Sequence, residues 1–155
     1  MQSELKVAQA LTTQNKTLAL AESCTGGLLS HRLTNIPGSS NFLKFALVAY
    51  SNETKEKLLK ISPAILKKHG AVSQPVAMAM AKGVRNLQKT DFGVSITGIA
   101  GPTGATKQKP IGLVYIAINT NKETLCLEYH FKGSRTSIKS QAVTQALHLL
   151  LEFLA

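Results

Sequence analysis

The sequence is poor in several residue types, and each shortage narrows the range of functions. It has no tryptophan, and aromatic residues make up only 5% of its 155 positions. The few aromatic residues are not interleaved with basic ones, so the pattern lacks the stacking platform of a protein that binds single-stranded nucleic acid. No apolar run reaches the ~18–20 residues that a membrane-spanning helix requires. We therefore expect neither nucleic acid nor a membrane as the partner.

Cysteine is also scarce, and the only two, Cys24 and Cys126, form no CxxC pair. No group of His, Cys and carboxylate residues has the spacing of a metal site. The N-terminal stretch MQSELKVAQALTTQNK lacks the continuous apolar segment of a secretory signal. These features predict a cytoplasmic protein with reduced cysteines and no bound metal.

Acidic residues are few, and the formal net charge is +10, with 18 basic residues against 8 acidic ones. Only three of the basic residues are arginines, and the lysines are spread from Lys6 to Lys139. This distribution favours a solvated, lysine-rich surface over a nucleic-acid-binding patch. It is also compatible with an anionic small substrate, such as a phosphate-bearing metabolite.

The apolar pattern predicts an α/β fold, because short runs of strand length alternate with helical periodicity before a final hairpin. This order predicts a three-layer αβα sandwich with a mixed sheet of roughly five strands. No linker or repeat divides the chain, so residues 1–155 are expected to form a single domain. The expected strands are 17–21, 45–50, 92–97, 112–119 and 124–131, and the expected helices are 3–14, 28–34, 52–59, 62–70, 74–87 and a last one from about 134.

The turn between the first strand and the second helix is the sharpest local feature, with the sequence ESCTGG at 22–27. Such a turn exposes Ser23 at the carboxyl end of a strand and directs backbone N–H groups of Thr25, Gly26 and Gly27 toward a ligand. The pattern suits a nucleophile beside an oxyanion hole. It equally suits an ordinary helix start, in which Ser23 or Thr25 is the N-cap. Cys24 is an alternative nucleophile, although a small packed residue is the simpler interpretation.

A serine nucleophile needs a base, and Lys55 is the preferred candidate. It is expected in the first turn of a helix capped by Asn52, where the helix dipole and partial burial both lower the pKa of an amine. Tyr50, at the end of the preceding strand, is placed to pass or orient the proton, or is merely a strand-end residue with a buried ring. The four histidines lie in unrelated segments, so a Ser–His–Asp triad with Asp91 is the lesser alternative.

A glycine-rich segment, TGIAGPTG at 97–104, follows the third strand and lacks the GxxxxGKS pattern of a phosphate-binding loop. At the same sheet edge as Ser23 it would form a second wall of one cleft. Arg135, at the start of the last helix, could pair with a phosphate or be a solvated arginine. The predicted substrate-binding residues are Gly98, Ile99, Ala100, Gly101 and Arg135.

Taken together, these segments resemble one family. The motifs are LALAESCTGG at 18–27, YSNETK at 50–55, GAVS at 70–73, TGIAGP at 97–102 and KPIG at 109–112. They are similar to the CinA C-terminal domain, whose stand-alone members are known as nicotinamide-nucleotide amidases. The likeness covers essentially the whole chain.

The resemblance implies hydrolysis of nicotinamide mononucleotide to nicotinate mononucleotide and ammonia, without metal or cofactor. It places the family's serine on Ser23, its tyrosine on Tyr50 and its lysine on Lys55. A homo-oligomer is also expected. Two positions depart from the family pattern: Gln74 stands where relatives often carry glutamate, and Lys139 where a second arginine is expected.

Two other functions remain open. One is a non-catalytic nucleotide-binding or competence-related regulatory module, as the family's name suggests. The other is a serine amidase for a different small carboxamide. Many relatives also carry a large N-terminal domain that resembles molybdopterin-binding proteins.

Overall fold

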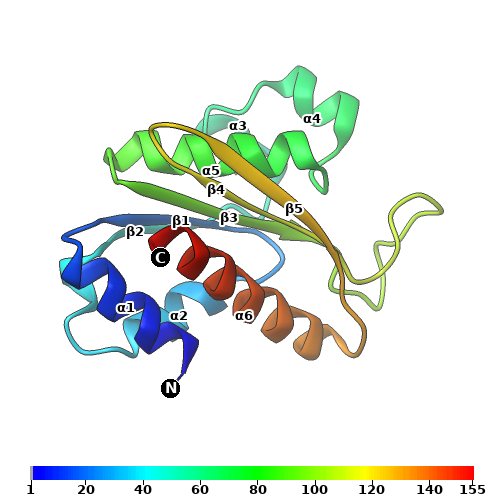
Figure 1. Cartoon of the computed structure of the whole chain (residues 1–155). Coiled ribbons are helices and arrows are strands. Elements are labelled where there is room, and N and C mark those ends of the chain that lie inside the picture. Colours follow the sequence, from blue (N-terminus) through cyan, green and yellow to red (C-terminus); the bar gives the residue numbers. More distant parts are fainter. Residues whose placement is uncertain (1) are drawn as a thin grey trace.

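Five strands form a mixed sheet at the centre of the computed structural model, which describes residues 2–155 (Figure 1). The sheet order is β2-β1-β3-β4-β5, with β1 parallel to β2 and β3, and β4 antiparallel to β3 and β5. The predicted mixed, five-stranded sheet is therefore confirmed. The strands are β1 Leu18–Glu22, β2 Leu43–Val48, β3 Phe92–Gly98, β4 Leu113–Asn119 and β5 Thr124–His130.

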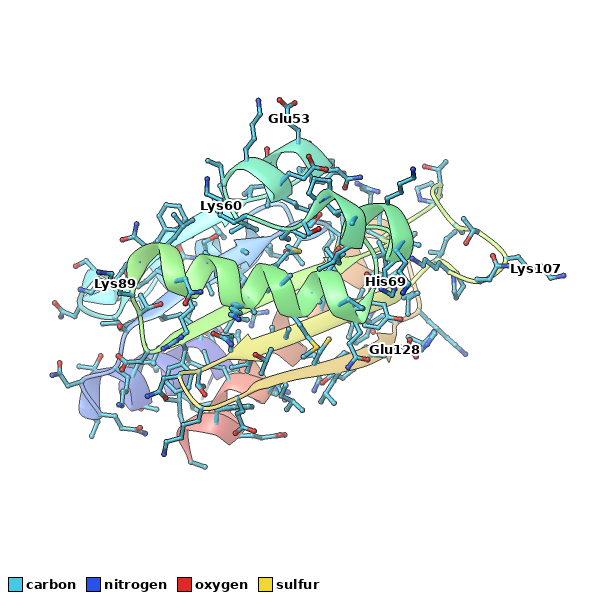
Figure 2. All side chains as sticks on the ribbon, turned by 90° about the horizontal axis from the view of Figure 1, so that it is seen from above. Glu53, Lys60, His69, Lys89, Lys107 and Glu128 are labelled. Carbon is cyan, nitrogen blue, oxygen red and sulfur yellow. The ribbon has the colours of Figure 1, made fainter. Side chains whose placement is uncertain are left out.

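Helices cover both faces of the sheet, which confirms the three-layer αβα sandwich (Figure 1). One layer holds α1, α2 and α6, and the other holds α5, with α3 and α4 alongside it (Figure 2). None of the helices within the described residues combines the length and apolarity needed to cross a bilayer. The helices are α1 Ser3–Thr13, α2 Leu28–Thr34, α3 Asn52–Lys57, α4 Pro63–His69, α5 Gln74–Gln88 and α6 Arg135–Leu154, with a 3₁₀ turn at Ser39–Asn41.

Strand β1 is buried on both faces, and its alternating sequence LALA serves the two layers differently. Leu18 and Leu20 belong to the core shared with α1 and α6. Ala19 and Ala21 point to the other side, toward α5. Small side chains on that side let α5 lie close to the sheet. Gly93 on β3 contributes to the same close approach, because a Cβ there would lie 2.2 Å from the carbonyl oxygen of Ala81 in α5.

Strand β2 begins and ends two residues earlier than the sequence predicts, at 43–48 in place of 45–50. The chain leaves the strand geometry at Ala49, whose amide still donates to the carbonyl of Glu22 at 2.8 Å. The following helix is capped by Ser51 and not by Asn52, because the Ser51 hydroxyl accepts from the amide of Thr54 at 3.1 Å. The predicted cap was therefore wrong by one residue.

The parallel strands β1, β2 and β3 end at the same edge of the sheet, which is where open α/β sheets bind ligands. Ser23 directly follows β1, Ala49 and Tyr50 follow β2, and the glycine-rich segment follows β3. The topology therefore brings three of the predicted motifs together, although they are far apart in the sequence.

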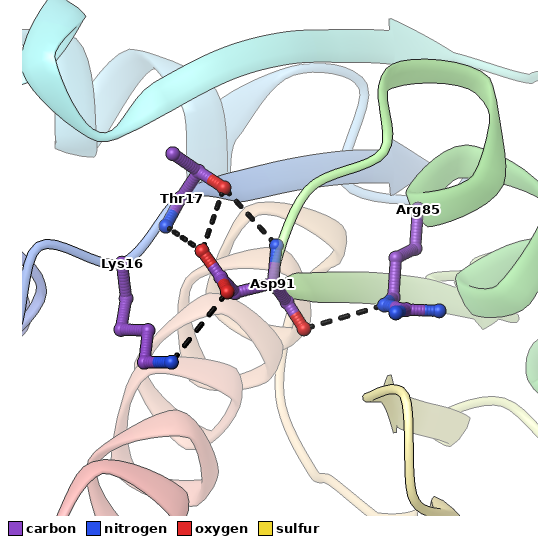
Figure 3. Close-up of polar contacts among 4 residues, drawn as sticks. All are labelled: Lys16, Thr17, Arg85 and Asp91. Atoms are coloured by element: carbon purple, nitrogen blue, oxygen red, sulfur yellow. Dashed lines mark hydrogen bonds and ion pairs between the residues drawn. The ribbon is translucent and has the colours of Figure 1, made fainter.

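At the opposite ends of these strands, Asp91, just before β3, is hydrogen-bonded to Thr17, just before β1 (Figure 3). Its carboxylate accepts from the amide and the hydroxyl of Thr17, at 2.8 and 2.9 Å, and the Thr17 hydroxyl accepts from the Asp91 amide at 3.0 Å. Lys16 forms a 3.6 Å ion pair with the same carboxylate. Leu18 pairs with Phe92 in the sheet, so Asp91 lies at the end of the sheet away from Ser23. The Ser–His–Asp alternative with Asp91 is therefore wrong.

Replacing Asp91 by Asn is expected to make the unfolding free energy less dependent on pH in the acidic range. Partial burial raises the pKa of Asp91, but the hydrogen bonds from Thr17 and the charge of Lys16 outweigh it, so this pKa lies below 3.8. The pKa of Asp91 is lower in the folded state than in the unfolded state. Its stabilisation is therefore present above the unfolded-state pKa and is lost as the pH falls through the folded-state pKa. The side chain is partly exposed, so we expect a loss of about 1 kcal/mol in unfolding free energy at neutral pH.

Denaturant unfolding from neutral to acidic pH checks this expectation, with Glu152→Gln as a control for an exposed carboxylate. The gap between wild type and Asp91→Asn should narrow as the pH drops below 3.8. A gap that stays constant with pH would contradict the assigned role.

Candidate active site

A cleft of about 380 Å³ opens at the carboxyl edge of β1, β2 and β3. Of the predicted site residues, it brings together Ser23, Tyr50, Lys55, the 98–101 segment and Arg135. Thr25, Gly26 and Gly27 are not among the residues that line it. The full lining is Ser23, Cys24, Tyr50, Lys55, Ala71, Val72, Thr97, Gly98, Ile99, Ala100, Gly101, Thr103, Gly104 and Arg135.

The Ser23 hydroxyl and the Lys55 amine form the central contact of this cleft. Lys55 Nζ lies 3.2 Å from Ser23 Oγ, within hydrogen-bond distance. Ser23 is held by its own backbone, because its amide donates to the carbonyl of Ile96 at 2.9 Å and so extends the pairing of β1 with β3. Position 23 therefore sits on the rigid sheet and not on a mobile loop.

The Lys55 side chain is only 1% exposed, which is rare for a lysine. Its amine donates to the carbonyls of Ala49 at 2.7 Å and Tyr50 at 3.3 Å. A neutral amine has two N–H groups, so these two carbonyls can take both and leave the lone pair facing the Ser23 hydroxyl. Burial lowers the pKa of Lys55 from its ordinary value. Lys55 is the fourth residue of α3 and belongs to the last turn of this short helix.

Glu22 occupies the start of α2, where the sequence predicts ligand-binding N–H groups. Its carboxylate accepts from the amides of Leu29 and Ser30, at 2.9 and 3.0 Å, and from the hydroxyl of Thr25 at 2.7 Å. The Ser30 hydroxyl is a fourth donor. The side chain is 1% exposed. An internal carboxylate therefore takes the position beside the helix N-terminus that an anionic ligand would otherwise occupy.

The turn at 25–27 lies outside the lining of the cleft, and one of its three predicted oxyanion donors, the amide of Gly26, is used within the turn itself. The amide of Gly26 donates to the carbonyl of Ser23 at 3.1 Å, which closes the turn. Gly26 and Gly27 have φ values of +60° and +100°, a region that favours glycine. One feature of the sequence indicates this structural role of Glu22. An acidic residue ends a fully buried apolar strand, and a buried carboxylate needs several hydrogen-bond donors.

Arg135 and Tyr50 join the two walls at the mouth of the cleft. Arg135 donates to the carbonyl of Gly101 at 2.6 Å and to the Tyr50 hydroxyl at 3.2 Å. Tyr50 is 61% exposed, so the alternative in which it is merely a strand-end residue with a buried ring is wrong. Lys55 contacts Tyr50 through the backbone carbonyl, and the phenol is directed to Arg135. These contacts place the Tyr50 hydroxyl beside a cation and not within the Ser23–Lys55 pair.

Cys24 also lines the cleft, but its environment suppresses its reactivity. Burial raises the pKa of the Cys24 thiol to about 12, so it is protonated at neutral pH. This result disfavours the alternative in which Cys24 is the nucleophile. Within residues 2–155, no group of three or more His, Cys, Asp or Glu side chains is arranged to hold a metal ion.

Replacing Glu22 by Ala is expected to destabilise the fold by about 3 kcal/mol, because four donors lose a buried charged acceptor. Denaturant unfolding measures the effect. Glu53→Ala is a matched control, since Glu53 makes an exposed ion pair with Lys57 and should cost less than about 0.5 kcal/mol. Equal losses for the two variants would show that the Glu22 contacts carry no special weight.

Replacing Lys55 by Met is expected to remove a pH dependence of stability. Because the folded-state pKa is lowered, the cost of burying the ammonium is full below that pKa and disappears above the unfolded value near 10.5. Wild-type stability should therefore rise with pH between these two values, and the rise should be absent in Lys55→Met. Unfolding free energies measured across this range test the assignment, with Lys57→Met as the exposed control from the same helix. Identical slopes in wild type and Lys55→Met would refute it.

Comparison with known proteins adds independent information. The CinA C-terminal domain family model matches residues 1–154. A CinA-like protein from Syntrophus aciditrophicus is 53% identical over 150 residues, which are 96% of this chain and 36% of that protein. A putative competence-damage inducible protein from Moorella thermoacetica is 51% identical over 140 residues, 90% of this chain and 34% of its own. The chain thus spans about a third of the length of these relatives.

Solved structures agree with the sequence comparison. The competence/damage inducible protein CihA from Agrobacterium tumefaciens has a TM-score of 0.96 at 34% identity, covering 99% of this chain and 94% of its own. A CinA superfamily protein from Klebsiella pneumoniae has a TM-score of 0.95 at 32% identity, with coverage of 98% and 95%. The motifs, the fold and these likenesses agree, and the chain belongs to the CinA C-terminal domain family.

Proposed function

We propose that this protein is an amidohydrolase that converts nicotinamide mononucleotide to nicotinate mononucleotide and ammonia. The observation that carries the proposal is the 3.2 Å contact between Ser23 Oγ and a buried Lys55 amine, at the base of an open cleft. A hydroxyl beside an amine of lowered pKa is the arrangement that acyl transfer by a serine nucleophile needs. The sequence resemblance supplies the substrate.

In the proposed mechanism, neutral Lys55 accepts the proton of Ser23 as Oγ attacks the carboxamide carbon. The carbonyls of Ala49 and Tyr50 stabilise the resulting ammonium. Lys55 then returns the proton to the departing ammonia, which leaves an acyl-enzyme ester on Ser23. Lys55 next takes a proton from water as the water attacks the ester, and passes that proton to the departing Ser23 Oγ, which releases nicotinate mononucleotide and restores the hydroxyl.

The structure's contacts change two details of the mechanism expected from sequence. The amide of Gly26 is already bonded, so we assign the oxyanion to amides of the opposite wall at 98–101, other than that of Ile99, which donates to the carbonyl of Leu113 at 2.9 Å. Tyr50 is assigned to binding at the cleft mouth and not to proton relay, because its hydroxyl faces Arg135.

The phosphate of the substrate is assigned to the first turns of α6. Arg135 lines the cleft, and the Lys139 amine lies 3.5 Å from the position of a Cβ on Gly26. The two cations are four residues apart and so lie on one side of the helix. Lys139 therefore supplies positive charge where the family pattern leads us to expect a second arginine. A cleft of about 380 Å³ is within the range of small-molecule sites.

The proposal predicts ammonia release from nicotinamide mononucleotide, with kcat reduced by about 1,000-fold or more in Ser23→Ala and Lys55→Ala. Cys24→Ala should stay within about ten-fold of wild type, because the thiol takes no part in the chemistry. The kcat/KM should rise with pH as the Lys55 amine loses its proton. Each variant is first checked for folding by circular dichroism.

Three outcomes would contradict the proposal or redirect it. An undiminished Ser23→Ala would exclude the serine mechanism. Binding of the nucleotide without turnover would favour a non-catalytic regulatory module, which the competence-related names of the relatives suggest. Preferential turnover of another carboxamide in a competition assay would keep the mechanism and change the substrate.

A further inference from the structure

The KPIG motif at 109–112 has no role in the chemistry described above, although it lies in a long exposed loop beside the cleft. This loop leaves β3, projects from the body of the molecule and returns to β4 (Figure 1). Residues 102–110 are exposed with one exception, Lys109, which is half-buried. Lys107, two positions earlier, lies at the far end of the projection in Figure 2.

The Lys109 amine donates to the backbone carbonyl of His69 at 2.6 Å. His69 is the last residue of α4, where carbonyls lack a partner within the helix and the dipole favours a cation. The contact joins two segments that are 40 residues apart in sequence. Lys109 is half-buried although the rest of residues 102–110 are exposed, and its partner is the carbonyl at the C-terminal end of α4.

Gly70 makes room for this contact. A Cβ on Gly70 would lie 3.0 Å from Lys109 Nζ, and its φ of +76° is one that a side chain disfavours. The GAVS and KPIG motifs therefore form one structural unit, in which the glycine of the first admits the lysine of the second.

Both partners of the contact are continuous with the cleft walls. Beyond His69, Ala71 and Val72 line one wall, and the Ala71 carbonyl accepts from the Thr97 hydroxyl at 2.9 Å. Lys109 belongs to the loop whose first part lines the other wall, through residues 98–101, Thr103 and Gly104. That loop is closed at its base by the pairing of Ile99 with Gly112, at 2.7 Å.

A short turn fixes Lys109 within the loop. The amide of Thr106 donates to the carbonyl of Lys109 at 2.8 Å, and the amide of Lys109 donates to the Thr106 hydroxyl at 3.1 Å. At the other end of the loop, Arg135 holds the carbonyl of Gly101. The loop is therefore attached to the body on two sides, to α6 through Arg135 and to α4 through Lys109.

We propose that Lys109 is a positioning residue. Its hydrogen bond to His69, here called the strap, attaches the loop between β3 and β4 to the end of α4 and so fixes the width of the cleft. It does not touch the reacting atoms, so its loss should weaken substrate binding more than it slows the chemical step. The kinetic part of this inference rests on the proposed function, whereas the structural part does not.

Lys109→Met tests the inference, because Met keeps an unbranched side chain of nearly the same length and removes the donor. Lys107→Met is the matched control, an exposed lysine of the same loop. With nicotinamide mononucleotide as substrate, KM should rise about ten-fold in Lys109→Met with kcat within about two-fold, and Lys107→Met should match wild type. Lys109→Arg, which retains a cationic donor, should recover most of the loss.

Amide hydrogen exchange on the ligand-free protein gives a readout that needs no activity. The amides of Thr106 and Lys109 should exchange about ten-fold faster in Lys109→Met and at the wild-type rate in Lys107→Met. Unchanged exchange would overturn the strap, whether or not the protein is an amidase. Faster exchange with an unchanged KM in an active enzyme would overturn the positioning role. If wild type is inactive, exchange alone decides the strap and the proposed function fails separately.

Discussion

The burial of the Lys55 amine is the constraint on which the rest of the site depends. Removing an amine from water disfavours its charged form, and only precise placement of acceptors compensates for that cost. The carbonyls of Ala49 and Tyr50 provide those acceptors, because the chain leaves β2 just before them. The end of β2, the start of α3 and the position of Ser23 at the end of β1 are therefore parts of one arrangement.

The fold could be predicted well from the sequence because its signals are local. Alternation in β1, the Gly and Pro residues at turns and the helical periodicity of α6 each lie within one segment. The order of elements then restricts the sheet to few topologies. The error at β2 has a local cause as well: apolar character continues through Ala49 and Tyr50, although the backbone there has turned to serve Lys55.

The site was only partly predictable, because its decisive contacts join distant segments. Ser23, Lys55 and Arg135 were identified from motifs and helix positions, and the cleft contains all three. The partners of Glu22 and of the Tyr50 hydroxyl were missed. Glu22 is a local exception, with partners three to eight positions away, whereas Tyr50 meets Arg135 85 positions away. The sequence alone does not give the distance or the relative orientation of two side chains that are so far apart along the chain.

The alanines of β1 have a consequence for the width of the cleft. Ala19 and Ala21 pack with Val76 and Met80 of α5, and α5 begins just after the Ala71–Val72 wall of the cleft. A larger side chain at either alanine would push this helix outward, since close-packed interiors transmit displacement. The wall would then move without any change in its own residues. The packing of β1 against α5 therefore sets the position of this wall, and a change in core volume can change the width of the cleft.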